Sequence, residues 1–311
     1  MATGQAVVNL GVCGNGSLVG FNTQKGCGYE FKNTIELWRT PANFEIDLTQ
    51  NFDASYITDL QKAGNLSILK GIADFPENGT DPLIETLPDN TEISAGDAKY
   101  KFSPVFAKDG SSDMYFNKLL GYLEGQSNNR FFFVDSAGNI LGTEGSDSTK
   151  LRGFLTSRTA RAKFTAQSSG VGQKAGLDFQ LANTYEYEDN WAMIFNENLP
   201  FDPRLVEAII QAEVSYTAVP TDGATTVTVS SKLARGLKDY VTGATNTADW
   251  KVSVNGVDTA VTNVAEAANV YTLTVAALST DDVVDVSFNN VIEIIGDGLY
   301  RSFTARTTTV A

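Results

Sequence analysis

The sequence predicts a mainly β protein with a few short helices, divided into two domains. Short runs of β-branched and aromatic residues recur along the chain, each bounded by Gly, Asn, Asp or Pro, as expected of strands joined by turns. In the C-terminal third, apolar and polar residues alternate with a period of two, the pattern of half-buried antiparallel strands. Short helices beside such sheets fit a mainly β fold with α+β elements.

In the N-terminal part, three segments show the strongest strand patterns: 98–102, 130–135 and 184–188. Two segments show helical spacing. The first runs from Ser55, its expected N-cap, to Ala63, and the second runs from Met114 to Leu123. We therefore expect a large β structure that carries two short helices.

A domain boundary is predicted at Pro200 and Pro203. After these prolines Phe and Gly become rarer, and Val, Thr and Ala become more frequent. Proline-containing linkers with a change of composition on either side are typical of domain borders. We expect residues 1–203 and 204–311 to fold as separate domains.

The second domain is expected to be an antiparallel β-sandwich of immunoglobulin type. Its alternating strands lie at 226–229, 250–254, 270–275 and 283–288. Asn255-Gly256 predicts a tight turn between two of them, and Trp250 is expected in the core. The domain contains no cysteine pair of the antibody kind.

Composition excludes several classes of function. With 23 Lys+Arg against 37 Asp+Glu, the formal net charge is -14, which repels nucleic acid and anionic membranes. The chain has no His, and therefore lacks the commonest near-neutral base and metal ligand. Cys13 and Cys27 lie among glycines, where they form either a small disulfide loop or, as we favour, two buried thiols. No signal peptide or membrane span is recognisable, so we expect synthesis in a cytoplasm.

Three motifs that suggest chemistry have simpler explanations. The glycines of 11–16 are not followed by the Lys-Ser/Thr pair of a phosphate-binding loop. The stretch 135–139 resembles part of a calcium loop, but a β-turn between two strands explains it better. Glu186 and Glu188 would share one face of the expected strand, as a glycosidase pair or as exposed charges. We expect no catalytic residues, no cofactor, no metal site and no enzymatic activity.

A basic strip is the most unusual local feature of this acidic chain. No Asp or Glu occurs between Asp147 and Asp178, and this interval holds Lys150, Arg152, Arg158, Arg161, Lys163 and Lys174. Such a strip is suited to an acidic patch on a neighbouring copy. We expect an inter-subunit contact in which cations of the strip meet nearby carboxylates, with these residues: Arg152, Arg158, Arg161, Lys163, Glu186, Glu188 and Asp189. A solvated basic face is the alternative, and nucleic-acid binding is a weaker one because only Phe154 and Phe164 are interleaved.

The two halves resemble known virion proteins. The C-terminal stretch, through Trp250–Gly256 and Val270–Leu278, resembles the bacterial immunoglobulin-like domains that are appended to proteins of tailed phages. The N-terminal half is similar in layout to phage tail tube (major tail) proteins, with strands, a helix, a long polar loop and a further β-hairpin.

This resemblance implies a tube-type β-sandwich or barrel domain that assembles with copies of itself. Tail tube proteins form hexameric rings whose strands join into one barrel around a channel, and a long loop and the termini stack the rings. The expected partners are thus other copies and other virion proteins, with DNA passing without specific binding and no membrane. The expected location is the virion, assembled in the host cytoplasm. The negative charge would keep DNA from binding to the channel wall, although it also suits simple solubility.

Two other interpretations stay open. The first is a phage capsid component, either a major shell protein or a head decoration protein. The second is an adhesion or carbohydrate-binding module built on the immunoglobulin-like domain, which the lack of a secretion signal disfavours. Images of the purified protein, showing tubes, shells or single particles, would separate them.

Overall fold

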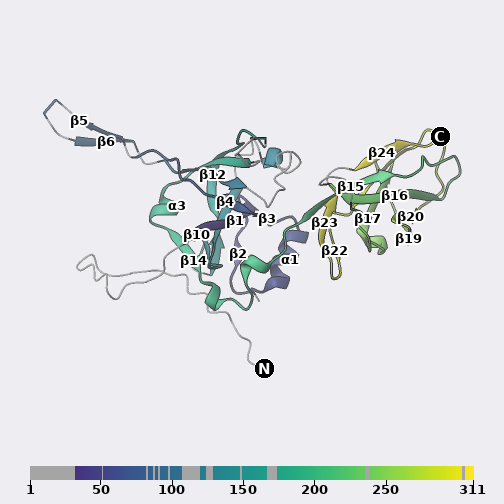
Figure 1. Ribbon diagram of the computed structural model, residues 1–311, viewed down its shortest axis with the longest axis horizontal. Helices are drawn as coiled ribbons and strands as arrows, with labels where there is room; N and C mark the ends of the chain where they lie inside the picture. Colours follow the sequence, from purple (N-terminus) through teal and green to yellow (C-terminus); the bar gives the residue numbers. More distant parts are fainter. Residues whose placement is uncertain are drawn as a thin grey trace, which may run out of the picture. The chain divides into compact units, whose positions relative to one another are not determined.

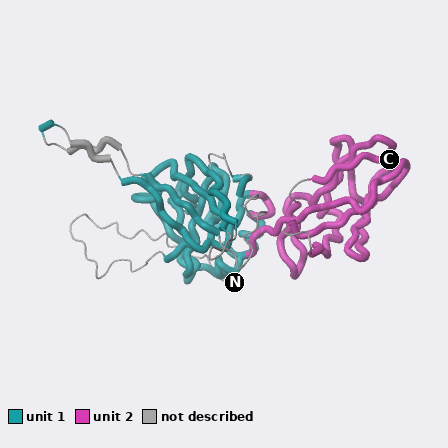
Figure 2. Tube along the Cα trace, turned by 45° about the horizontal axis from the view of Figure 1, so that its top comes forward, with its two compact units in different colours: residues 1–60, 65–206 teal, residues 61–64, 207–311 magenta. Residues whose placement is uncertain are grey.

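The computed structural model of the chain confirms a mainly β fold with short helices. It describes residues 32–50, 52–81, 83–86, 88–89, 92–96, 99–106, 120–123, 129–147, 149–166, 174–234, 239–302 and 305–311. The chain forms two compact units, residues 1–60 with 65–206 and residues 61–64 with 207–311 (Figure 2). Cys13, Cys27, the glycines of 11–16 and most of the expected helix 114–123 lie outside the described residues. The predicted border after residue 203 stays a prediction.

The strands of the first unit pair in a ring, which closes a barrel. The hydrogen-bonded order leads from β4 through β8, β13, β12, β9 and β1 to β3, and β3 continues directly into β4. Figure 1 labels β1, β3, β4 and β12 of this ring. The members are β1 (Thr34–Pro41), β3 (Ser67–Lys70), β4 (Ile72–Asp74), β8 (Val105–Phe106), β9 (Asn129–Asp135), β12 (Phe154–Arg161) and β13 (Ala175–Leu181), and β7 (Lys101–Phe102) also pairs with β13. A ring of this kind leaves few of the open sheet edges that otherwise promote aggregation.

Two local irregularities allow the ring to close. Gly71, with φ at 82°, separates β3 from β4, so one bent segment pairs with β1 before the glycine and with β8 after it. Glycine adopts this left-handed conformation without steric cost. A bulge between Thr156 and Arg158 lets β12 pair first with β9 and then with β13. Bulges of this kind bend strands at barrel corners.

Aromatic side chains fill the barrel. Phe133 of β9 lies at the centre, with ring centroids 5.1 Å from Phe75, 5.2 Å from Phe102 and 5.1 Å from Phe154. Leu37 and Leu177, both fully buried, belong to the same cluster. Because side chains occupy the interior, the barrel is a packed core and not a pore.

Strand β9 is buried along its whole length, on both faces. Phe132 points away from the barrel towards a side sheet, where its ring lies against Gly142 of β10. That side sheet consists of β10 (Ile140–Glu144), β14 (Trp191–Ile194), β11 (Lys150–Arg152) and β2 (Ile46–Asp47). Double burial explains the continuous apolar run 131–134.

The expected helix at 55–63 is confirmed as α1 (Ala54–Lys62). Its cap is one correction: the Asp53 carboxylate, and not Ser55, accepts a hydrogen bond from the N–H of Tyr56 at 2.9 Å. Leu120 and the 3₁₀ turn η1 (Gly121–Leu123) are the described part of the other expected helix. Short 3₁₀ turns also occur at η2 (Asn196–Asn198), η3 (Pro203–Leu205) and η4 (Thr247–Asp249).

The turn predicted at 135–139 is confirmed as the β9–β10 hairpin, with Val134 opposite Ile140. Asp135 is fully buried and holds the turn by accepting from the N–H groups of Ala137 (2.8 Å) and Asn139 (2.9 Å). In this Asx-type turn the Asp side chain accepts hydrogen bonds from backbone N–H groups. This use of an Asp explains why the sequence 135–139 resembles part of a calcium loop.

The second unit is a two-sheet β-sandwich. One sheet has the order β19-β20-β16-β15-β23-β22 and the other β18-β17-β21-β24. The first contains β15 (Ile210–Tyr216), β16 (Thr226–Leu233), β19 (Asn263–Ala267), β20 (Val270–Thr274), β22 (Val291–Ile294) and β23 (Gly298–Ser302). The second contains β17 (Trp250–Val254), β18 (Val257–Thr259), β21 (Val283–Phe288) and β24 (Arg306–Thr309). The four strands predicted here are therefore confirmed.

The strand order matches the immunoglobulin arrangement. In this arrangement β15, β16 and β17 correspond to strands A, B and C, β18 to C′, and β19, β20, β21 and β24 to D, E, F and G. The two sheets then have the orders D-E-B-A and C′-C-F-G. The hairpin β22–β23 is an insertion between F and G, and β23 joins the first sheet by pairing in parallel with β15. This insertion was not expected from the sequence.

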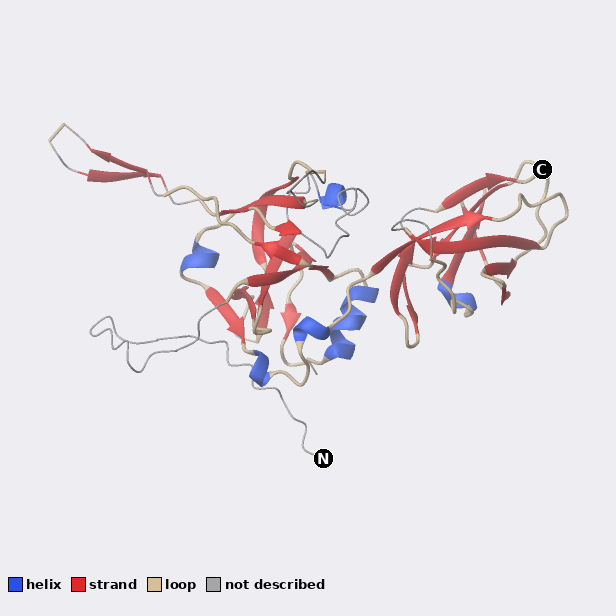
Figure 3. Ribbon diagram, in the orientation of Figure 1, coloured by secondary structure: helices blue, strands red, loops and turns tan. Residues whose placement is uncertain are grey.

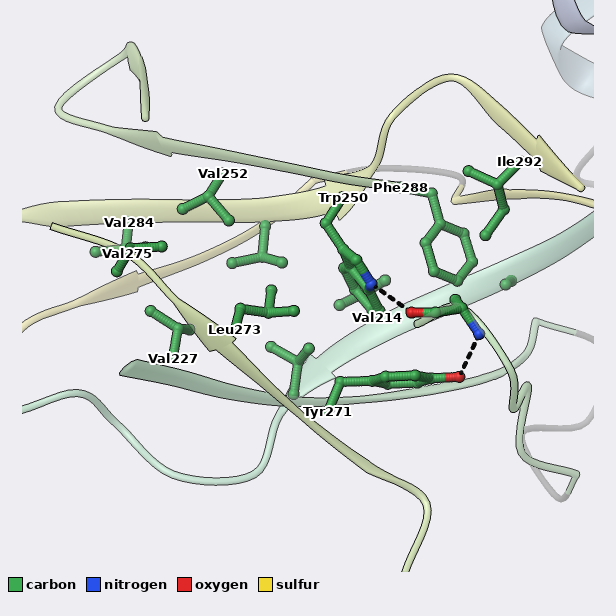
Figure 4. Close-up of a cluster of buried hydrophobic side chains, with 14 of the residues drawn as sticks. Val214, Val227, Trp250, Val252, Tyr271, Leu273, Val275, Val284, Phe288 and Ile292 are labelled. Atoms are coloured by element: carbon green, nitrogen blue, oxygen red, sulfur yellow. Dashed lines mark hydrogen bonds between the residues drawn. The ribbon is translucent and has the colours of Figure 1, made fainter. Parts of the chain in front are cut away.

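Trp250 occupies the core between the two sheets (Figure 4). It is 4% exposed, and its ring centroid lies 4.9 Å from those of Tyr271 and Phe288. Its indole N–H donates to the carbonyl of Ala244 at 2.8 Å. The predicted tight turn is also confirmed, since Asn255 (φ 52°) and Gly256 (φ 80°) have the left-handed angles of a type I′ turn.

Replacing Trp250 with Ala should lower the free energy of unfolding of the second unit by about 3–5 kcal/mol, because a large buried ring and its hydrogen bond are lost. Urea denaturation followed by far-UV circular dichroism measures this. Val257→Ala is the matched control, since Val257 is 69% exposed and should change stability by less than about 0.5 kcal/mol. Equal effects of the two substitutions would contradict the placement of Trp250 in the core.

Limited proteolysis of the native protein should release a fragment of roughly 100 residues, because a linker between folded units is the accessible place to cut. Mass spectrometry should locate the cut at 200–206. Cleavage only within 218–223, and never nearer the prolines, would show that the border lies elsewhere.

Candidate functional site

The described residues contain no group of three or more metal-ligating side chains, and no helix among them is both long and apolar enough to cross a membrane. Three features of the first unit bear on contacts with other chains: the basic strip, the helix α3 (Tyr185–Glu188) and the ribbon at 76–103.

The first cations of the basic strip have partners within their own chain. Arg152 forms an ion pair with Glu45, and the Nζ atom of Lys150 lies 3.7 Å from the same carboxylate and 3.5 Å from that of Asp147. Ser146 also donates to Glu45, from its N–H at 2.9 Å. Glu45 thus joins the β11 region to the segment before β2, and Arg152 serves this internal contact.

The next two cations lie on opposite faces of β12. Arg158 pairs with Gln180 and Arg161 with Leu177, and side chains three positions apart in a strand point to opposite sides. Both are exposed. Arg161 shares its face with the buried Leu177, and its guanidinium lies close to Gly121 of η1. The strip is therefore continuous in sequence but does not form one patch.

The expected strand at 184–188 is wrong, because residues 185–188 form the short helix α3. A helix turns by about 100° per residue, so Glu186 and Glu188 do not share one face. Glu186 accepts from the buried Arg130 at 3.2 Å and from the N–H of Leu155 at 2.9 Å. Its carboxylate is therefore engaged inside the unit.

The other two acidic residues of this group differ in their contacts. Glu188 accepts a 2.6 Å hydrogen bond from the hydroxyl of Tyr100, and this bond raises the pKa of Tyr100 to about 12. Asp189 is exposed and follows the helix. Sequence reasoning missed Arg130 as the partner of Glu186. The sequence signal for this ion pair was Arg130 itself, a single Arg directly before the apolar run 131–134, at a position expected to be buried.

A two-stranded ribbon leaves the barrel between β4 and β7. Backbone hydrogen bonds join Asn78 to Lys101 at 2.7 Å and Thr80 to Lys99 at 2.9 Å. Further along, β5 (Leu83–Thr86) pairs with β6 (Glu92–Gly96), and in the described part of the chain neither pairs with another strand. Figure 3 shows these two strands apart from the sheets. Of the expected strand 98–102, only 101–102 is a strand, and Lys99 makes an isolated bridge.

An isolated two-stranded ribbon is marginally stable in water at best. Its outer edges carry unpaired backbone donors and acceptors, which can pair with another chain. The ribbon is therefore the feature of the described surface best suited to contact a neighbour. Comparison of the chain with protein-family models and with curated proteins finds no match.

Replacing Glu186 with Lys should destabilise the first unit by about 3–5 kcal/mol, because the buried Arg130 would lose its carboxylate and face a like charge. Chemical denaturation of the purified variant measures this. Asp189→Lys is the matched control, since Asp189 is exposed, and its effect should stay within about 0.5 kcal/mol. If Glu186→Lys is as stable as the parent, the ion pair does not hold α3 on the barrel.

Proposed function

We propose that this chain is a structural subunit of a phage tail tube, which assembles with copies of itself into stacked rings. The observation that carries the proposal is the outer part of the ribbon, where β5 and β6 pair with each other and with no other strand in the described residues. A protein that acts alone gains nothing from such an element, whereas an assembling subunit can bind a neighbour with it.

Three further features support an assembling structural role. The core of the barrel is packed with aromatic side chains, which suits a rigid building block. The immunoglobulin-type sandwich is a frequent appendage of the virion proteins that the sequence resembles. The net charge of -14 suits a channel that must let DNA slide without binding it. Copies of this chain and other virion proteins are then the partners, and the virion is the location.

Purified protein should form rings and tubes in negative-stain images and a concentration-dependent oligomer by sedimentation velocity. Replacing residues 81–98 with a two-residue Asn-Gly turn should abolish tubes, because Thr80 and Lys99 already face each other and would close a short hairpin. Near-UV circular dichroism should show an unchanged fold.

Truncation after Val206 is the control for this experiment, because we expect the appended sandwich to be dispensable for assembly. Shells in place of tubes would favour a capsid protein, and single particles at every concentration would contradict self-assembly. Tubes formed by the ribbon-shortened variant would remove the ribbon from the proposal.

A further inference from the structure

A cavity of about 470 Å³ opens in the wall of the barrel where β1 and β4 separate. The ladder between β1 and β3 ends at the pair Glu36–Lys70, and after Gly71 the chain turns to pair with β8. Residues 32–35 and 72–75 therefore flank an opening. Its volume lies within the range of about 300–1,000 Å³ that is typical of ligand sites.

The walls of this cavity are suited to a positively charged group. Phe75, Phe102, Phe133 and Tyr187 line it with aromatic rings, and Asp74 and Glu77 line it with carboxylates. Burial, together with the Glu77 carboxylate, raises the pKa of Tyr187. Aromatic faces beside carboxylates attract ammonium and guanidinium groups by cation–π and Coulomb forces.

The two acidic groups of the cavity are available. Within the described residues, no Lys or Arg forms an ion pair with Asp74 or Glu77, although Lys32 also lines the cavity. Both acidic side chains belong to exposed residues. Unlike Glu186, they are not engaged by a buried Arg.

The cations that fit this cavity lie on the hairpin that β12 and β13 form. Its stem continues beyond the strands through the bridge between Thr165 and Lys174. Lys163 and Lys174 are exposed on this stem and have no ion-pair partner among the described residues. The sequence between Asp147 and Asp178 contains no Asp or Glu, so the part of the hairpin that precedes Asp178 of β13 has only positive charges. Long, flexible Lys side chains can reach into a cavity of this size.

We propose that the cavity at residues 72–77 of one copy receives Lys163 or Lys174 of a second copy. This inference rests on the proposed self-assembly and specifies its contact. The hairpin stem and the cavity belong to different strands of one subunit, with β8 between them, and a head-to-tail contact between the two sites generates closed rings or filaments. Charge complementarity between the two surfaces sets the register of the copies.

Carbodiimide coupling tests the contact without any substitution, because it joins a Lys amine to a carboxylate only where the two already touch. The protein is prepared unlabelled and ¹⁵N-labelled, and the two are mixed, assembled and coupled. Mass spectrometry should find Lys163 or Lys174 joined to Asp74 or Glu77 in peptide pairs of mixed isotope. Coupling of these lysines only within one isotope, or only to other carboxylates, overturns the proposal.

Two charge-reversed proteins provide the second test. In the first, Asp74→Lys and Glu77→Lys reverse the charge of the cavity. In the second, Lys163→Glu and Lys174→Glu reverse the charge of the hairpin stem. Each alone should weaken self-association by about 10-fold or more. Mixed together, they should co-assemble in alternation, because the cavity of each protein then meets a hairpin of opposite charge on the other. All four changes in one chain should restore assembly.

Asp59→Lys together with Asp239→Lys is the control that matches the cavity reversal in net charge, since both residues are exposed and lie outside the cavity and the hairpin. Sedimentation velocity over a range of salt gives the readout, and thermal melting confirms folding. If the parent assembles and both reversed proteins assemble equally well, this contact is wrong while the proposed function stands. If the parent never assembles, the proposed function itself fails.

Discussion

The double burial of β9 is the constraint on which the first unit depends. One face of this strand supplies Phe131 and Phe133 to the barrel, and the other supplies Phe132 to the side sheet. The strand pairs with β1 along one edge and with β10 and β12 along the other, so it joins every layer of the unit. A strand buried in this way cannot carry a free charge, because an unpaired ion in such a place is destabilising by several kcal/mol.

Arg130 lies within this strand, and the groups that pair with its charged guanidinium shape the nearby surface. Its guanidinium donates to the carbonyls of Ala42 and Gly153, both at 2.7 Å, and to the carboxylate of Glu186. These contacts hold α3 against β9 and place Tyr187 of the helix among the barrel aromatics, 5.2 Å from Phe154. Glu186, which was expected to contact a neighbouring copy, is therefore part of the core. The need to neutralise the buried Arg130 thus decides that this carboxylate is not exposed for an inter-subunit contact.

The sequence was a good guide where local rules decide the structure, and a poor one where distant partners do. Alternation predicted the strands of the sandwich, and Asn255-Gly256 predicted their turn, because period and turn chemistry depend only on neighbouring residues. The segment 184–188 alternates as a strand does, yet Arg130, more than 50 positions away, holds it as a helix. Barrel closure through Gly71, the pairing of Arg152 with Glu45 and the opening beside β4 likewise arise from contacts that no local pattern contains.

An acidic subunit that assembles must place its few free cations with care. Repulsion between copies grows with each subunit added, and exposed charges separated by more than about 8 Å are screened at physiological salt. Attraction must then come from charges brought close together at the contact. Many cations of the first unit are used internally, as Arg130, Arg152 and Lys70 show by their pairs with Glu186, Glu45 and Glu36. The hairpin of β12 and β13, whose sequence contains Asp178 as its single acidic residue, keeps cations exposed, and a head-to-tail contact uses each of them once per subunit. Such an arrangement offsets repulsion locally while the rest of the surface keeps its negative charge.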